Sequence, residues 1–428
     1  MRQEISEPAS PSQHDGNGYD LALRYREVRS RTEELCKPLE IEDYQVQSMP
    51  DASPAKWHLA HSTWFFETFV LQAWDPNYRP FNPAFSYLFN SYYNAVGKRW
   101  DRSSRGVLSR PTVREVYAYR HAIDERLLAL LHDHGLSREL ESVLVLGLNH
   151  EQQHQELLLT DIKHAFTCNP LRPAYCQVPR VDRRRPHRSL SWSSYPAGVR
   201  WIGYSGREFA FDNEMPRHRV FVEAFAIADR LVTAGEYLEF MADRGYERPE
   251  LWLSDGWNAR SAHGWQAPLY WEWHDGHWRQ MTLHGMRDVE PDEPVCHVSY
   301  YESDAFARWA GARLPTEADW QTAAKDSEVK GNFVESGCLH PVPAAEESDK
   351  QFFGDTWEWT SSPYVAYPGY RPAAGALGEY NGKFMCNQLV LQGGSCVTPQ
   401  SHIRRSYRNF FPPDARWQFS GLRLSKDT

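Results

Sequence analysis

Apolar residues in the first part of the chain recur every three or four positions, the spacing of one face of an α-helix. This pattern predicts helices over Asp20–Cys36, over Pro54–Trp74, from Arg110 to about His134, and over Ser137–Phe166. Pro54 falls in a first helical turn, where proline is tolerated, and Ser137 is a suitable N-cap. Such helices predict a bundle, a fold that builds metal sites from side chains on facing helices.

The pattern changes after Pro170. Residues 171–194 are rich in proline and arginine and predict a linker. Beyond them, turns alternate with short β-like runs and with two predicted helices: Val199–Ile202, Phe209–Phe211 and His218–Ala224 for the strands, Thr233–Asp243 and Tyr300–Ala310 for the helices. We therefore expect an α+β protein with a polar, disordered tail (1–18), a helical bundle (19–170), the linker and a second, irregular domain (195–428).

Composition excludes several classes of protein. The formal net charge of -9 argues against a nucleic-acid-binding protein, because such proteins present a basic face, and the basic run Arg180–Arg188 is local. No apolar run is long enough to cross a membrane, and the N-terminus lacks the apolar core of a signal peptide. Seven scattered cysteines without a CxxC pair fit a reducing compartment, so a cytoplasmic protein is expected. The pattern does not specify an oligomeric state.

Two histidines lie four positions apart in the last predicted helix of the bundle. His150 and His154 are therefore neighbours on one helical face and can bind one metal ion. Imidazole suits iron, zinc, copper or nickel. The second predicted helix carries His58 and His61, and either of these would complete a site of three histidines.

Two alternatives remain at this point. The same segment satisfies the H-E-x-x-H pattern of zinc hydrolases, with Glu151 as general base, although Thr160 stands where a metzincin would have its third histidine. A zinc hydrolase or thiol transferase is therefore one alternative. A binding module whose bundle is only structural is the other.

The long segment 75–109 between the second and third predicted helices also contains side chains that could act in catalysis or substrate binding. Loops of this length inside compact domains are usually functional. Tyr92 and Tyr93 could supply a proton beside a metal, while Arg99, Arg102 and Arg105 offer bidentate partners for a carboxylate.

The second half resembles a known domain. The resemblance to the formylglycine-generating-enzyme (sulfatase-modifying factor) domain, a C-type-lectin-like fold, is carried by Pro294–Tyr300, Trp309–Trp320, Gly354–Thr360, Gly393–Ser395 and Gly421–Arg423. That enzyme holds copper through two cysteines, and the corresponding positions here lie near Thr398 and Ile403. Sulfatase maturation is therefore not expected.

The first half resembles a DinB-type bundle, through the Leu-Ala-His segment ending at His61 and the H-x3-H-x-E segment from His150 to Glu156. A DinB bundle followed by this lectin-like domain is the arrangement of the ergothioneine-pathway iron sulfoxide synthases. The resemblance implies that His61, His150 and His154 hold Fe(II). It further implies oxidative C–S coupling of a thiol to Nα-trimethylhistidine (hercynine) by O2, giving a sulfoxide.

The same resemblance assigns residues to the substrates. Gln153 matches the glutamine that binds the substrate imidazole, and Tyr380, Asn409 and Phe410 match positions around the trimethylammonium group. Members that use γ-glutamylcysteine carry an aspartate where Phe411 stands here.

Those members also have an active-site tyrosine at the position of Leu377. The resemblance therefore implies the branch that uses free cysteine, with Tyr93 as proton donor and Tyr92 as second choice. The arginines considered for the cysteine carboxylate are Arg416, Arg99, Arg102 and Arg105. γ-Glutamylcysteine as sulfur donor, or the 5-histidylcysteine sulfoxide synthase activity of the ovothiol pathway, remain alternatives.

Overall fold

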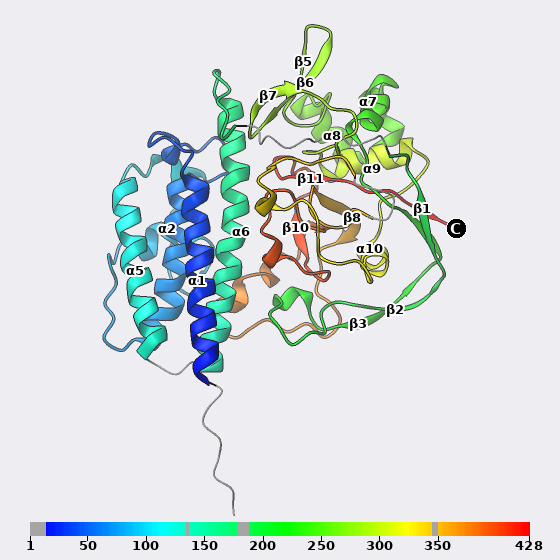
Figure 1. Ribbon diagram of the computed structural model, residues 1–428. Helices are drawn as coiled ribbons and strands as arrows, with labels where there is room; N and C mark the ends of the chain where they lie inside the picture. The colour runs from blue at the N-terminus through cyan, green and yellow to red at the C-terminus, as the bar shows by residue number, and fades with distance from the viewer. Residues whose placement is uncertain (1–13, 134–136, 178–187, 345–349) are drawn as a thin grey trace, which may run out of the picture.

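The computed structural model describes residues 14–133, 137–177, 188–344 and 350–428. A helical bundle forms one side of the molecule, and a mixed domain packs against its last helix, α6 (Figure 1). The helices of the bundle side are α1 (His14–Cys36), α2 (Ala55–Phe66), α3 (Gln72–Trp74), α4 (Phe85–Phe89), α5 (Val113–Asp133) and α6 (Arg138–Cys168).

The predicted bundle helices are confirmed. A π-helical turn, Glu67–Leu71, joins α2 to α3, so the predicted Pro54–Trp74 helix is nearly continuous. Ser137 caps α6, since its side chain accepts a hydrogen bond from the backbone N–H of Leu140 at 3.2 Å. The start of α1 at His14 lies within the tail expected to be disordered, whose first 13 residues are outside the described ranges.

The second domain consists of short strands and helices around a buried core. Its helices are α7 (Ala234–Ala242), α8 (Ser254–His263), α9 (Tyr300–Trp309) and α10 (Glu317–Ala323). Its strands are β1 (Trp192–Tyr195), β2 (Gly198–Ile202), β3 (His218–Val222), β4 (Phe225–Ala228), β5 (Trp271–His274), β6 (His277–Thr282), β7 (Gly285–Asp288), β8 (Trp357–Pro363), β9 (Leu389–Gln392), β10 (Asn409–Phe411), β11 (Ser420–Gly421) and β12 (Ser425–Asp427). They form sheets ordered β1-β4-β12, β10-β9-β8-β11, β2-β3 and β5-β6-β7.

Some of the sequence predictions need correction. Phe209–Phe211 is not a strand: the two phenylalanine rings pack edge to face 5.0 Å apart, and Phe211 precedes a 3-10 turn, Asp212–Glu214. The predicted loop 75–109 contains α4 and a 3-10 helix, Arg102–Val107. The basic run Arg180–Arg188 lies outside the described residues except at its last position.

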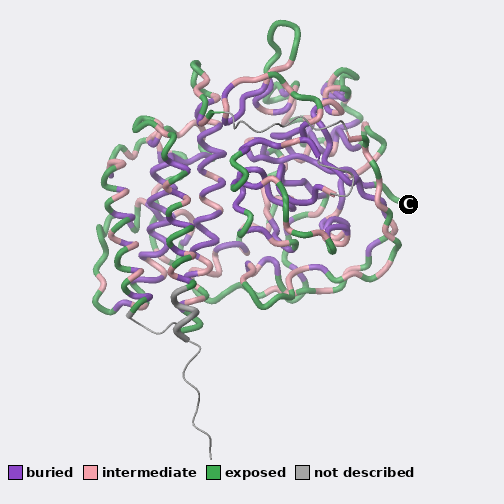
Figure 2. Tube along the Cα trace, viewed as in Figure 1, coloured by how far each residue is buried: buried purple, intermediate pink, exposed green. Residues whose placement is uncertain are grey.

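Helix α6 is the wall shared by both halves of the molecule. Figure 2 shows it buried along most of its length, between the bundle and the second domain. It packs against α1 and α2 on the bundle side and against the 3-10 turn Gln400–His402 of the second domain. The strand β10 forms one edge of the four-stranded sheet.

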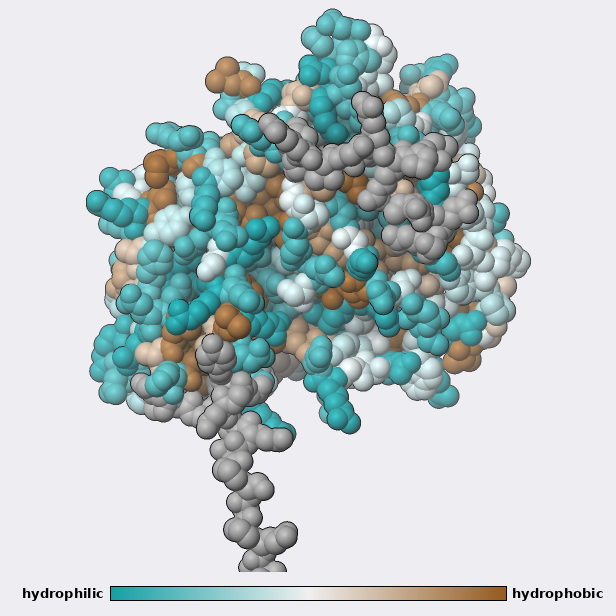
Figure 3. Space-filling view, in the orientation of Figure 1, coloured by the Kyte–Doolittle hydropathy of each residue, from teal (hydrophilic) through white to brown (hydrophobic). Residues whose placement is uncertain are grey.

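The face seen in Figure 3 is mainly hydrophilic, with hydrophobic residues in small separate groups. Within the described ranges, no helix combines the length and the apolar character needed to cross a membrane.

Candidate metal centre and adjoining cavity

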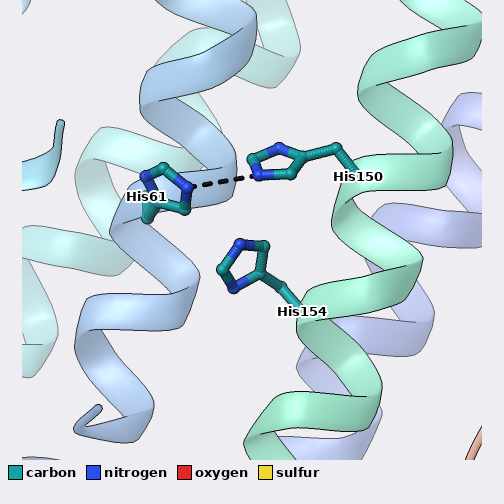
Figure 4. Close-up of side chains that lie close together, drawn as sticks. All are labelled: His61, His150 and His154. Carbon is teal, nitrogen blue, oxygen red and sulfur yellow. Dashed lines mark hydrogen bonds between the residues drawn. The ribbon is translucent and has the colours of Figure 1, made fainter. Parts of the chain in front are cut away.

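Three histidines meet between α2 and α6. His61 on α2 faces His150 and His154 on α6, and Figure 4 shows their rings turned toward one common space. One ligand nitrogen of each lies within 4.8 Å of the other two, and all three side chains are buried. The Nε2 atoms of His61 and His150 are 3.2 Å apart. The predicted triad is therefore brought together.

Close packing of α2 on α6 makes this meeting possible. A Cβ atom at Gly147, one turn before His150, would stand 2.5 Å from the ring of Phe66 and 2.9 Å from that of Phe65. Only glycine fits between these rings, so the absence of a side chain at Gly147 sets the separation of the two helices.

Hydrogen bonds behind two of the rings fix which nitrogen faces the common space. His61 donates from Nδ1 to the carbonyl oxygen of Phe89 at 2.6 Å, which leaves the lone pair on Nε2. A carboxylate only accepts, so His58 donates from Nε2 to Asp161 at 3.0 Å. The Nδ1 of His58 then accepts the Nδ1–H of His154 at 2.9 Å, and His154 also presents Nε2.

The electrostatics favour neutral imidazoles. Burial lowers the pKa of His150 to about 3, and it lowers the pKa values of His61 and His154 well below the usual range, as do the neighbouring histidines. The Nδ1 of His150 has no hydrogen-bond partner within the described part of the protein. Three nitrogen lone pairs therefore point into one buried space, and two of these nitrogens are only 3.2 Å apart. This arrangement suits a metal ion that binds each nitrogen at about 2.0–2.1 Å, because neutral nitrogens with facing lone pairs cannot hydrogen-bond to one another.

Glu151 does not have the position that a hydrolytic general base needs. It points to the other side of α6, where it accepts hydrogen bonds from Arg29 at 2.8 Å, Thr32 at 2.6 Å and Arg120 at 2.5 Å. Burial alone would raise the pKa of Glu151, but the guanidinium groups of Arg120 and Arg29 hold it at about 2. The H-E-x-x-H interpretation as a zinc hydrolase is wrong in its assignment of the base, because this carboxylate is bound within the bundle.

A cavity of about 410 Å³ opens beside the histidines, between the bundle and the second domain. From the bundle side it is lined by His150, His154, Gln153, Tyr92, Arg99, Arg102, Arg105 and Asp161. From the second domain it is lined by Trp357, Tyr380, Phe384, Tyr407, Asn409, Phe410, Phe411 and Gln418. Most of the predicted site residues therefore surround one space.

Gln153 is held in one orientation by the second domain. Its Nε2 donates to the hydroxyl of Tyr407 at 2.7 Å, and its Oε1 accepts from the hydroxyl of Tyr380. The hydroxyl of Tyr407 is in turn 2.9 Å from Nε2 of His402, whose Nδ1 lies 3.1 Å from Oδ1 of Asn149. Sequence analysis missed Tyr407 and His402, since nothing local connects them to a helix some 250 residues earlier.

The two predicted tyrosines differ in position. Tyr92 lines the cavity, whereas Tyr93 is fully buried behind it, with its ring stacked on that of Tyr92 at 4.7 Å. Burial raises the pKa of both phenols, and for Tyr93 the nearby Tyr92 and Tyr380 raise it further, so both remain protonated at neutral pH.

Aromatic rings form the wall opposite the histidines. The ring of Phe410 stacks on Tyr364 at 4.0 Å and lies 5.8 Å from that of Phe384. Phe411 also lines the cavity and lies 6.1 Å from the ring of Trp417. This wall offers ring faces, and the charge of Arg408, which also lines the cavity, is paired with Glu317 at 2.7 Å.

The four arginines considered for the cysteine carboxylate differ in their position relative to the cavity. Arg99, Arg102 and Arg105 line the cavity, and among these only Arg105 is buried. Arg416 does not line it: this side chain pairs with Glu302 at 2.8 Å and lies over the ring of Trp265. The prediction of Arg416 as a carboxylate ligand is therefore corrected, because its charge is already neutralised within the second domain.

Comparisons with known proteins agree with this architecture. Residues 24–158 match the DinB superfamily, and residues 191–350 and 349–428 match the sulfatase-modifying factor enzyme 1-like domain. Fold and site together define a metalloprotein in which a DinB bundle carries the histidines and a sulfatase-modifying-factor-like domain closes the cavity.

Similar proteins of known name identify a family within this class of metalloproteins. The chain is 32% identical to the hercynine oxygenase of Mycobacterium tuberculosis, over 95% of this chain and 98% of that one. It is 30% identical to the hercynine oxygenase of Mycolicibacterium thermoresistibile, over 95% of each chain. The formylglycine-generating enzyme of Bos taurus is 25% identical over 58% of this chain and 77% of its own length. The chain belongs to the hercynine oxygenase family, a family of oxidoreductases.

Proposed function

We propose that this protein is an iron(II)- and O2-dependent hercynylcysteine sulfoxide synthase of ergothioneine biosynthesis. It would couple the thiol of cysteine to the imidazole of hercynine and oxidise the sulfur to a sulfoxide. The observation that carries the proposal is the buried triad His61, His150 and His154, of which His150 and His154 line a cavity between the two domains. Membership of the hercynine oxygenase family supports the choice of hercynine and O2.

The ligand set suits the proposed metal. Three neutral imidazoles add no negative charge, so an Fe(II) ion held by them keeps its positive charge for a substrate thiolate. When bound, iron supplies the redox chemistry by which O2 oxidises the two substrates. The remaining roles fall to the residues around the cavity.

The aromatic wall is suited to the trimethylammonium group of hercynine. A quaternary ammonium has no hydrogen to donate, so it is recognised by ring faces, and Phe410 offers one with Phe384 and Tyr92 beside it. Asn409 lines the same wall. Unmethylated histidine would gain less from this wall, which favours hercynine over the ovothiol-pathway substrate.

The imidazole of hercynine would then lie beside Gln153. The side-chain amide of this residue is already oriented by Tyr407 and Tyr380, so it can hold the substrate ring without reorganising. Tyr93, with Tyr92 as the alternative, is proposed to donate a proton from a phenol that stays protonated at neutral pH.

Two measurements test this function. Protein purified without oxygen is analysed for metal, and O2 uptake is then followed with cysteine and hercynine, with the product identified by mass spectrometry. We expect iron, and uptake that requires both substrates. Zinc without uptake would contradict the proposal.

A variant of one metal-ligating histidine tests the site assignment. His154→Ala is expected to lose iron and activity while keeping the fold, because one of three ligands is removed. His121→Ala, which removes an exposed histidine of α5, is the matched control and should keep both. Full activity in His154→Ala would contradict the site assignment.

A further inference from the structure

The hydrogen bonds that hold Gln153 belong to a longer chain, which leaves α6 and returns to it. The hydroxyl of Tyr380 donates to Oε1 of Gln153, and Nε2 of Gln153 donates to the hydroxyl of Tyr407 at 2.7 Å. The Tyr407 hydroxyl lies 2.9 Å from Nε2 of His402, whose Nδ1 lies 3.1 Å from Oδ1 of Asn149. The chain therefore returns to α6 at Asn149, one helical turn before the residue that it holds.

The last bond of this chain fixes its direction. The side-chain nitrogen of Asn149 donates to the carbonyl oxygen of Val145 at 2.9 Å, and a carbonyl oxygen can only accept. The amide oxygen of Asn149 therefore faces His402. Because this oxygen also only accepts, the imidazole of His402 must carry its proton on Nδ1.

His402 is neutral in this position. Its side chain is 1% exposed, and burial, with Arg404 beside it, lowers the pKa of His402 well below the usual range. A neutral imidazole that is protonated on Nδ1 has a lone pair on Nε2, so the hydroxyl of Tyr407 donates to it. This hydroxyl has one hydrogen, so toward Gln153 it can only accept, and the amide nitrogen of Gln153 must face it.

Aromatic packing holds the links of the chain together. The buried ring of Phe211 stacks on that of Tyr380 at 5.4 Å. It also lies edge-on to the rings of His402 and Tyr407, at 5.9 and 5.7 Å. Gln153, Tyr380 and Tyr407 line the cavity, whereas His402 does not. His402 can therefore influence a ligand in the cavity only through Tyr407.

We infer that His402 is a positioning residue for the substrate that carries the imidazole. Through Tyr407 it holds the amide of Gln153 with its nitrogen toward Tyr407 and its oxygen toward Tyr380. The inference rests on the proposed function, in which Gln153 binds the imidazole of hercynine. The amide oxygen keeps one lone pair beyond its bond to Tyr380, and this lone pair can accept the N–H of a neutral imidazole.

Loss of His402 would remove the direction of the chain. The hydroxyl of Tyr407 would be free to turn and donate to the amide oxygen of Gln153, so the amide could adopt either orientation. In the reversed orientation a substrate N–H meets the N–H of the amide, and no hydrogen bond forms between two donors. Hercynine should then bind more weakly, whereas cysteine, which has no imidazole, should not.

Binding of the two substrates separates positioning from stability. Iron-loaded protein of measured metal content is titrated under argon, by isothermal titration calorimetry, with hercynine and with cysteine. His402→Leu should bind hercynine at least 10-fold more weakly and cysteine within about 3-fold of wild type. Tyr407→Phe should show the same pattern, because it removes the acceptor of the Gln153 nitrogen. An equal loss for both substrates would mean that His402 is structural, and it would overturn the inference.

A conservative variant tests the hydrogen bonds themselves. Glutamine has an oxygen that accepts and a nitrogen that donates, so His402→Gln should recover hercynine binding to within about 3-fold of wild type. If it binds hercynine no better than His402→Leu, these hydrogen bonds do not hold Gln153 and the inference is wrong. His218→Leu is the matched control: it removes a histidine of the same domain that does not line this cavity, and it should leave both affinities unchanged.

A measurement on the wild-type protein needs no substrate. In zinc-loaded protein labelled with 15N-histidine, long-range 1H–15N spectra show which ring nitrogen carries the proton, and the signal of His402 is identified by its absence in His402→Gln. We expect the proton on Nδ1, and a proton on Nε2 would reverse the chain and overturn the inference. Protein with the proton on Nδ1 that consumes no O2 with cysteine and hercynine would contradict the proposed function and leave the direction of the chain standing.

Discussion

At the scale of single residues, the site is defined by which atom of a side chain faces the cavity. His61 and His154 each use one nitrogen for a hydrogen bond behind the ring and present the other to the common space. Tyr92 and Tyr93 are neighbours in sequence and stacked in space, yet only Tyr92 reaches the cavity wall. The two phenols therefore have to be distinguished by experiment.

The prediction is that Tyr93→Phe keeps substrate binding but diverts the products. Without the proton donor, oxidation of the thiol alone, for example to cysteine sulfinic acid, should replace C–S coupling, with the sulfoxide yield falling at least 10-fold. Products are quantified by mass spectrometry after a single turnover, and Tyr92→Phe is the matched variant. An unchanged yield in Tyr93→Phe with a loss in Tyr92→Phe would transfer the role to Tyr92.

Which single site residues the sequence predicts depends on how far apart along the chain the interacting residues lie. His150 and His154 follow from helical spacing, but the choice of His61 over His58 rested on family resemblance. Asp161 was missed, although it follows His154 by two helical turns and so lies on the same face. Gln418 could not have been found, because its place beside the bundle is set only by folding of the second domain.

At the scale of elements, α6 shows why local patterns predict a helix but not its surroundings. His150 and His154 face α2, Glu151 and Gln155 face α1, and Gln152 and Glu156 face the second domain. An apolar stripe identifies the helix, whereas the polar side chains acquire partners only when three different neighbours pack against it. For this reason the H-E-x-x-H pattern suggested Glu151 as a general base, although its carboxylate binds residues of the bundle.

Glu151 is predicted to stabilise the bundle rather than to take part in catalysis. In Glu151→Gln the two buried guanidinium groups lose the counter-charge that they share, although Arg29 keeps Asp124 and Arg120 keeps Glu33, so the free energy of unfolding should fall by about 3 kcal/mol near neutral pH. Because the pKa of Glu151 is about 2 in the folded protein and about 4.5 when unfolded, this stabilisation is present above pH 4.5. It should be lost as the pH falls from 4.5 toward 2.

Urea unfolding of the two proteins at several pH values measures this difference. Their stabilities should converge as the pH approaches 2, while Glu125→Ala, an exposed site on α5, should stay within about 0.5 kcal/mol of wild type at each pH. A fully stable but inactive Glu151→Gln would restore the general-base assignment.

At the scale of the whole molecule, the site exists only where the two domains meet. The metal ligands all come from the bundle, whereas the aromatic wall comes from the second domain. The segment that follows Tyr92 and Tyr93 also binds to the second domain. The carboxylate of Glu379 accepts hydrogen bonds from the backbone N–H groups of Asn94 and Ala95 at 3.0 and 2.9 Å. Metal binding and substrate binding should therefore be separable by weakening the contact between domains.

Glu156 is the residue through which this contact can be weakened. It is buried on α6 and accepts from Trp357 at 2.6 Å, Ser395 at 2.9 Å and Thr398 at 2.8 Å. In Glu156→Gln one oxygen is replaced by a donor, so not all three bonds can form, at a cost of about 2–4 kcal/mol.

We expect Glu156→Gln to keep its iron but to exchange amide hydrogens faster in 389–411 and to bind hercynine at least 10-fold more weakly. Hydrogen exchange followed by mass spectrometry, metal analysis and calorimetry measure the three effects. Gln152→Ala, which removes a single hydrogen bond to Ser401, is the control and should show a smaller change in each. Loss of iron in Glu156→Gln with unchanged exchange in 389–411 would mean that this carboxylate supports the histidines directly. The separation of the two domains' roles would then fail, because the bundle could not hold its metal without this side chain.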